Sequence, residues 1–342
     1  MVKGRKSWAV LGSVAALSIV AAACGSDDGG TGASGLSGQI VISGSSTVQP
    51  ISALVAEIFN ETNPDVQISV DGPGTSDGFE LFCAGDIDIA DASRPIDEEE
   101  VQACADAGIE YVELEVAFDG ITVMTNPDNA DVTCLNLGDL YALFGPESEG
   151  FTNWSDASAL AQQVGGTGSF PDVPLEITAP GEESGTYDAF LDLAGIEDTA
   201  IAQGVPEEEA AALRKDYHPS PDDNVIIQAM EGSPSSLGFV GFAFAQEAGD
   251  QIKELEVDGG DGCIAPSAET IADASYPLSR SLYIYVSKTS FAEDPGVKAY
   301  VDFYLTDESL NGPESLVGLT GYVPLPQDRI DAARTTWSSE SA

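Results

Sequence analysis

Short apolar segments alternate with helical patterns along most of this chain, and this alternation limits its fold more than any other feature. Runs of β-branched or alternating apolar residues predict strands, whereas apolar residues spaced three and four apart predict helices. Strands that alternate with helices in this way predict an α/β fold. The expected strands lie at 39–42, 66–70, 87–90, 121–125, 175–178, 237–242 and 282–286. The expected helices lie at 50–60, from 79 onward, and at 137–144, 184–193, 225–230 and 297–305.

Several of the expected strands end in loops rich in glycine and hydroxyl side chains. In open α/β sheets, ligands bind at the carboxyl edge of the strands. A bound oxyanion requires hydroxyl groups and unpaired backbone N–H groups at helix starts. Any one such loop also fits an ordinary helix cap or turn, but several in one chain predict an oxyanion site. The residues concerned are Ser45, Ser46, Thr47, Thr75, Ser76, Ser184, Gly185 and Thr186.

Arg94 places a positive charge beside this candidate site. It follows Ser93 at the end of an expected strand, and no other Lys or Arg lies between the basic start of the chain and Arg214. A planar guanidinium can clamp two oxygens of one oxyanion, and we predict that role for Arg94. The alternative is a surface ion pair with a neighbouring carboxylate.

The chain as a whole is strongly acidic. It has 12 Lys and Arg against 58 Asp and Glu, which gives a formal net charge of −46. This charge argues against nucleic acid or an anionic membrane surface as a partner. It does not exclude a bound anion, because salt screens surface charge beyond about 10 Å and the donors of a closed cleft act at short range.

The first 24 residues have the features of an export signal. A basic start precedes an apolar run at 8–23, which is too short for a membrane span. Three alanines then precede Cys24, an arrangement typical of a bacterial lipoprotein cleavage site. We expect a lipid on Cys24, a flexible tether at 25–37, and a location at the outer face of the cytoplasmic membrane. The alternative is an ordinary secretory signal with a coincidental cysteine.

Four more cysteines remain after Cys24. In an exported chain, an even number of cysteines favours disulfides over free thiols. The sequence allows three pairings, of which we expect the close pair Cys83–Cys104 with the distant pair Cys134–Cys263.

The chain resembles the periplasmic-type phosphate-binding proteins that serve the phosphate-specific ABC transporter. The matching segments fall in family order between about 38 and 337, and they lie at 43–48, 82–85, 89–96, 117–120, 153–155, 184–188, 222–224 and 238–242. The resemblance implies a type II periplasmic-binding-protein fold, in which two hinge strands join two α/β lobes around a ligand cleft. We expect the first lobe at 38–120, the second at 121–268 and a return to the first at 269–342.

The resemblance also implies which residues contact the anion. Val48 would contribute through its backbone N–H. Some relatives carry an arginine just before the Ser-Gly-Thr motif, but residues 180–183 contain no cation here, so Arg94 must supply the clamp. The implied contacts are Ser46, Thr47, Val48, Thr75, Ser93, Arg94, Ser184, Gly185 and Thr186.

Selection of phosphate over sulfate needs a hydrogen-bond acceptor. Phosphate keeps a proton at neutral pH and sulfate has none, so a carboxylate in a dry cleft accepts a hydrogen bond from the first and repels the second. An unpaired buried polar group costs roughly 1–3 kcal/mol. The choice among the candidate acceptors stays open, and they are Asp77, Asp91, Asp119 and Glu183.

Catalysis has little support in the sequence. The single histidine, His218, lies in a loop rich in proline and aspartate, and no nucleophile elbow or zinc motif is present. We therefore expect a monomeric binding protein with no cofactor or metal, whose partners are inorganic phosphate and the permease subunits of an ABC importer. The alternatives are a receptor for another oxyanion such as sulfate or molybdate, a phosphate-ester hydrolase that uses Ser184 or a metal, and a surface protein without a working site.

Overall fold

The computed structural model describes residues 35–182 and 184–341, all within one compact unit. The predictions for the export signal, Cys24 and most of the tether therefore lie outside the described residues.

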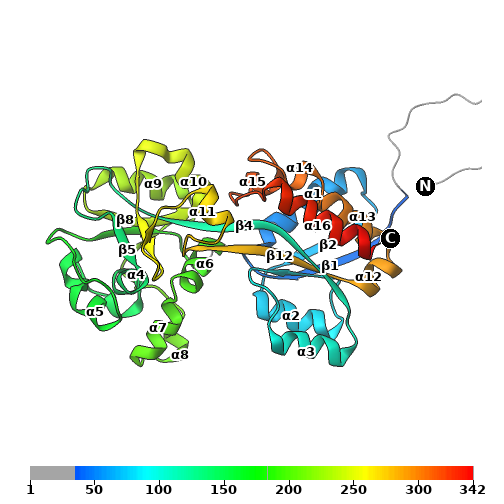
Figure 1. The fold of residues 1–342 in the computed structure, drawn as a ribbon, viewed down its shortest axis with the longest axis horizontal. Helices are drawn as coiled ribbons and strands as arrows, with labels where there is room; N and C mark the ends of the chain where they lie inside the picture. The colour runs from blue at the N-terminus through cyan, green and yellow to red at the C-terminus, as the bar shows by residue number, and fades with distance from the viewer. Residues whose placement is uncertain (1–34, 183, 342) are drawn as a thin grey trace, which may run out of the picture. The chain divides into compact units, whose positions relative to one another are not determined.

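One large mixed sheet runs through the unit in the order β2-β1-β3-β12-β4-β8-β6-β7, with β9 paired to β4 (Figure 1). β1 is parallel to both β2 and β3, and β6 is parallel to β8, whereas β12 and β4 are antiparallel to their neighbours. The strands are β1 Gly38–Gly44, β2 Val66–Asp71, β3 Ile89–Ala92, β4 Tyr111–Thr125, β6 Glu176–Ala179, β7 His218–Pro219, β8 Ser236–Gly241, β9 Lys253–Glu254 and β12 Ser279–Ser287.

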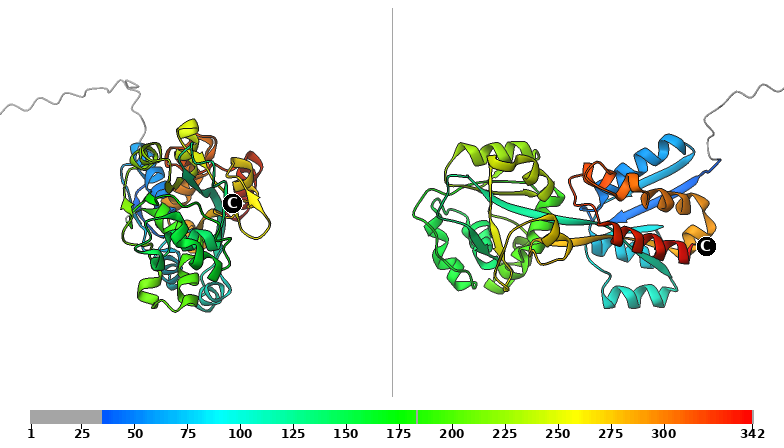
Figure 2. Two further views of the ribbon diagram at one scale, coloured as in Figure 1. Left: turned by 90° about the vertical axis from the view of Figure 1, so that its left-hand side faces the viewer. Right: turned by 45° about the horizontal axis from the view of Figure 1, so that its top comes forward.

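Strands β4 and β12 connect two lobes, as the ribbon in Figure 1 and the right-hand view in Figure 2 show. The first part of β4 pairs with β12 as far as Gly120, and its last part pairs with β8 from Ile121 onward. The prediction of an α/β fold with two lobes and two crossing strands is confirmed. The predicted lobe boundaries at 120/121 and 268/269 stay predictions.

Helices flank the sheet in both lobes (Figure 1). They are α1 Gln49–Thr62, α2 Thr75–Ala84, α3 Glu98–Ala107, α4 Leu137–Phe144, α5 Ser158–Gln163, α6 Gly185–Leu193, α7 Ile196–Gln203, α8 Glu207–Ala210, α9 Asp223–Gly232, α10 Phe242–Ala248, α11 Ala268–Ala272, α12 Lys288–Glu293, α13 Pro295–Tyr304, α14 Asp307–Leu310, α15 Leu316–Leu319 and α16 Gln327–Glu340. A small second sheet has the order β11-β10-β5, from Cys263–Ile264, Glu256–Asp258 and Cys134–Asn136.

Two elements differ from their predicted bounds in ways that affect the site. Helix α2 begins at Thr75 rather than at 79, because Gly74 adopts a φ of 130° and so ends the loop earlier, and Asp77 stabilises the positive end of the helix. Thr75 is therefore the first residue of a helix. Strand β4 begins at Tyr111, well before 121, because residues 111–119 pair along β12.

Both predicted disulfides are present in the structure. Cys83 is bonded to Cys104, which joins α2 to α3. Cys134 is bonded to Cys263, which joins the two outer strands of the small sheet. The two bonds therefore tie together a helix pair in one lobe and a sheet in the other.

Helix α2 packs closely against the end of β1 at Gly78. A Cβ added to Gly78 would lie 2.5 Å from the Cα of Gly44, so the helix and the strand end touch through backbone atoms. We predict that Gly78→Ala lowers the free energy of unfolding by about 1–3 kcal/mol through overpacking, measured by urea denaturation. Gly232→Ala is the matched control, since a Cβ there meets nothing within 4 Å. A Gly78→Ala protein as stable as this control would contradict the close packing.

Candidate functional site

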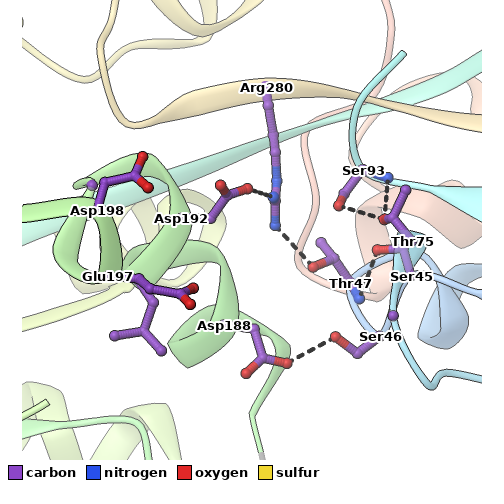
Figure 3. A pocket seen from close by; sticks show the side chains of 13 residues that line it. Ser45, Ser46, Thr47, Thr75, Ser93, Asp188, Asp192, Glu197, Asp198 and Arg280 are labelled. Carbon is purple, nitrogen blue, oxygen red and sulfur yellow. Dashed lines mark hydrogen bonds and ion pairs between the residues drawn. The ribbon is translucent and has the colours of Figure 1, made fainter. Parts of the chain in front are cut away.

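A cavity of about 440 Å³ lies between loops of the first lobe and helix α6 of the second (Figure 3). One wall is rich in hydroxyl groups, the opposite wall is rich in carboxylates, and one arginine lies between them. The lining residues are Ser45, Ser46, Thr47, Gly74, Thr75, Ser93, Asp188, Leu191, Asp192, Gly195, Glu197, Asp198 and Arg280.

The hydroxyl wall is formed at the carboxyl ends of three parallel strands. Ser45 follows β1, Thr75 lies at the start of the helix after β2, and Ser93 follows β3. The Thr75 and Ser93 hydroxyl oxygens are 3.1 Å apart, and the Ser93 N–H donates to the Thr75 hydroxyl at 3.2 Å. The parallel register of β1 with β2 and β3 therefore brings these predicted residues together.

The turn from Ser45 to Val48 is held by its own hydrogen bonds. The Ser45 N–H donates to the Asp91 carbonyl at 2.8 Å, and the Thr47 N–H donates to the Ser45 hydroxyl at 3.2 Å. The Val48 N–H donates to the Ser45 carbonyl at 3.2 Å, and the Val48 side chain is fully buried. Val48 therefore does not line the cavity, and its predicted contact with an anion stays a prediction.

The Ser-Gly-Thr motif forms the start of α6 but does not line the cavity. Ser184 caps the helix, and its hydroxyl accepts from the Thr186 N–H at 3.2 Å. Gly185 packs against the first lobe, where an added Cβ would lie 3.3 Å from the Ser46 carbonyl oxygen. The lining residues of α6 are Asp188, in its first turn, and Leu191 and Asp192 further along the helix.

Asp188 of α6 makes a hydrogen bond across the cavity. Its carboxylate accepts from the Ser46 hydroxyl at 2.9 Å (Figure 3). The Ser46 hydroxyl of the first lobe is thus already hydrogen-bonded to a carboxylate of the second lobe.

Arg94 lies beside the cavity rather than in its lining, and so does Ser76. The Arg94 guanidinium donates to both oxygens of Glu100, at 2.7 and 2.8 Å, and to the Ser76 hydroxyl at 3.0 Å. The hydrogen bonds that Arg94 donates to Glu100 raise the pKa of Arg94 above its ordinary value. This is the ion pair that the sequence offered as the alternative, and the clamp role of Arg94 stays a prediction.

Arg280, which the sequence analysis did not single out, is the arginine that lines the cavity (Figure 3). Its guanidinium donates to Asp192 at 2.6 Å and to the Thr47 hydroxyl at 3.0 Å, and its Nε lies 3.4 Å from Asp119. One signal could have revealed it: Arg280 stands just before an expected strand, and a strand that crosses between lobes brings its side chains to the cleft.

Of the four carboxyl groups predicted to accept the phosphate proton, Glu183 lies outside the described residues, and the other three do not line the cavity. Asp77 is exposed on α2, and Asp119 pairs with Arg280. Burial raises the pKa of Asp119, although Arg280 opposes that rise. Asp91 is fully buried behind the hydroxyl wall.

The Asp91 carboxyl group is only half satisfied. Its Oδ1 accepts from the Ser52 hydroxyl at 2.9 Å, while its Oδ2 is buried without a hydrogen-bond partner among the described residues. Burial raises the pKa of Asp91 to about 8, because a desolvated carboxylate is costly.

Comparison with known proteins shows the family to which this chain belongs. The family profile described as a PBP superfamily domain matches residues 29–308. The chain is 37% identical to Protein SphX of Synechocystis, over 87% of this chain and 82% of that protein. It is 32% identical to the phosphate-binding protein PstS of Staphylococcus aureus, over 94% of this chain and 89% of the relative. The chain belongs to the PstS family of phosphate-binding proteins.

A solved structure supports the same family assignment. A possible phosphate binding protein from Planctomyces limnophilus is 31% identical, with a TM-score of 0.78 over 90% of this chain and 100% of that one. The PstS-type fold is therefore shared along nearly the whole chain. In residues 35–182 and 184–341, no helix has both the length and the apolar character needed to cross a membrane.

The pKa of Asp91 gives this PstS-family chain a specific pH dependence. A carboxyl whose pKa is about 8 when folded and near 4 when unfolded keeps its proton only in the folded state between these pH values. Stability from this group is therefore present below pH 4 and is lost as the pH rises to 8. We predict that wild type loses up to about 5 kcal/mol of unfolding free energy relative to Asp91→Asn across this range.

Urea denaturation at several pH values between 4 and 8 measures this difference. Asp65→Asn, which removes an exposed carboxylate from a turn outside the helices, controls for the loss of one charge. Parallel pH profiles for wild type and Asp91→Asn would mean that Asp91 is ionised in the folded protein.

Proposed function

We propose that this protein is an extracytoplasmic receptor that binds inorganic phosphate in the cavity between its lobes and delivers it to an ABC importer. The observation that carries the proposal is the meeting of hydroxyl groups from three strand ends with an arginine in one cavity. Membership of the PstS family supports the same ligand, since the relatives named above include phosphate-binding proteins.

The hydroxyl wall suits a small oxyanion with several oxygens. Hydrogen bonds to a charged group contribute roughly 1.5–3 kcal/mol each. The lining hydroxyls come from short side chains on a turn and a helix start, which lose little entropy when they bind. Helix α6 begins against the turn that contains Ser46 and Thr47, so the N–H groups and positive end of α6 lie near an anion held there. The five hydroxyl groups belong to Ser45, Ser46, Thr47, Thr75 and Ser93.

The carboxylate wall supports phosphate over sulfate. Asp188 and Asp192 face the hydroxyl wall across the cavity. A carboxylate at this place accepts a hydrogen bond from the proton that phosphate retains, and it repels an anion that has no proton. The proton acceptor is therefore proposed to be Asp188 of α6, in place of the four carboxyl groups expected from the sequence.

A binding role is favoured over hydrolysis. The Ser184 hydroxyl, which a hydrolase would need as its nucleophile, caps α6 and accepts from a backbone N–H. A nucleophilic serine requires an adjacent base, and His218 is exposed on β7 and does not line the cavity.

Calorimetric titration of the full chain, freed of bound anion, tests the ligand. We predict one phosphate bound per chain and no heat from sulfate at the same concentration, because only phosphate satisfies both walls. Absence of phosphate binding by folded protein would contradict the proposed function. Equal binding of sulfate would leave an oxyanion receptor but would remove the role of the carboxylate wall.

A pair of double variants locates the bound phosphate in this cavity. Thr75→Val with Ser93→Ala removes two hydroxyls of the wall, and it should weaken phosphate binding by roughly 10²-fold. Thr335→Val with Ser338→Ala removes two hydroxyls from the exposed face of α16 and should leave phosphate affinity unchanged.

We further propose that a lipid on Cys24 holds the receptor at the membrane, as a monomer that docks on the permease subunits of its importer. A bacterial lipoprotein carries several acyl chains, which a stable anchor needs. Cys24→Ala should move the protein from the membrane fraction to the soluble fraction and abolish labelling with radioactive palmitate. Unchanged membrane retention and no lipid label on the wild-type chain would contradict the anchor.

A further inference from the structure

We propose that Arg280 is the guanidinium that binds the anion, and that Asp192 is its resident counter-ion, which the anion displaces. This inference rests on the proposed binding of phosphate in the same cavity. It assigns the cationic role to a residue of a crossing strand rather than to a loop of the first lobe.

Arg280 is held at the point where the crossing strands meet the cavity. In the antiparallel register of β12 and β4, Arg280 lies directly opposite Asp119. Its side chain is 12% exposed, and it contacts Asp119 on the neighbouring strand, Thr47 in the first lobe and Asp192 in the second. An anion that contacts Arg280 is therefore within reach of both lobes.

The two carboxylates on Arg280 are bound unequally. Asp119 is 6% exposed, and separating it from Arg280 would leave a buried charge without a partner, which is costly. Asp119 therefore keeps its ion pair and orients the guanidinium. Asp192 is 69% exposed, and an exposed carboxylate exchanges its ion pair for water at little cost. Asp192 is thus the partner that an incoming anion can replace, and the nitrogen it occupies becomes a donor to the anion.

Thr47 is prepared for the same exchange. Its hydroxyl oxygen accepts from Arg280, which leaves the hydroxyl hydrogen available for donation. An anion beside Arg280 can therefore accept from the Thr47 hydroxyl and from the guanidinium together. Figure 3 shows these two side chains joined by their hydrogen bond.

Arg94 is less suited to this role in its present arrangement. Both arms of its guanidinium are bound to Glu100, whose side chain is only 15% exposed. Exchange of Glu100 for an anion would leave a mostly buried carboxylate without its partner, and that is costly. The exchange at Arg280 leaves an exposed carboxylate in water instead.

The test is calorimetric titration of phosphate into the full-length wild type and four single variants. Arg280→Gln should weaken phosphate binding by roughly 10²-fold, because it removes a charged donor. Asp192→Asn should tighten binding by about 3- to 10-fold, because the anion no longer has to displace a competing carboxylate. Asp307→Asn removes the same charge from a similarly exposed Asp–Arg pair that does not line the cavity, and it should change affinity less than about 2-fold. Arg94→Ala should have a smaller effect than Arg280→Gln.

The outcomes separate this inference from the proposed function. If wild type does not bind phosphate, the proposed function fails. If wild type binds and folded Arg280→Gln binds equally well, Arg280 is not the anion's cation. If Asp192→Asn tightens binding no more than Asp307→Asn, Asp192 is not a competing counter-ion. If Arg94→Ala loses binding while Arg280→Gln keeps it, the cation is Arg94. Because loss of Arg280 leaves Asp119 unpaired and could impair folding, the exposed Asp192→Asn variant keeps the test decisive.

Discussion

The antiparallel pairing of β4 with β12 is the interaction on which the rest of the structure depends. The two strands are hydrogen-bonded in register from Ser279 opposite Gly120 to Ser287 opposite Tyr111, with one irregularity at Leu282. They join strands β1, β2 and β3, which lead into the hydroxyl loops, to strands β8 and β6, the second of which leads into α6. This pairing fixes the register in which the residues of the two cavity walls face each other.

The proposed anion site lies in an acidic cavity, and its hydrogen-bond donors are paired with carboxylates of that cavity. Buried donors need partners whether or not a ligand is bound. Here the Ser46 hydroxyl and the Arg280 guanidinium find them in two carboxylates of α6, Asp188 and Asp192. In the proposed mechanism, binding of an anion exchanges one set of oxygen acceptors for another. The free energy of binding would then be the difference between these sets, and we expect small changes in the internal carboxylates to have large effects on affinity.

The sequence predicted those parts of the fold and site that depend on local pattern. The spacing of apolar residues located β1 and α1, and the hydroxyl loops after parallel strands were expected to meet at one edge, as Thr75 and Ser93 do. The missed features depend on which side chains meet in the folded chain, and a local pattern does not determine that. The position of Arg280 follows from its register with Asp119, 161 residues away. The pairing of Arg94 with Glu100 depends on side-chain geometry at the start of α3, which residue spacing does not determine.

The net charge of −46 acts on approach to the site more than on binding within it. Most basic side chains of the described residues are already paired with carboxylates at the surface, such as Arg329 with Glu115 and Arg334 with Asp307. The surface therefore repels an anion over the screening length of the medium, about 10 Å at moderate salt. Inside the cavity, hydroxyls and one guanidinium act at contact distance, where salt screens little. We therefore expect the rate of capture to depend on ionic strength, and the proposed selectivity to depend on the geometry of the two facing walls.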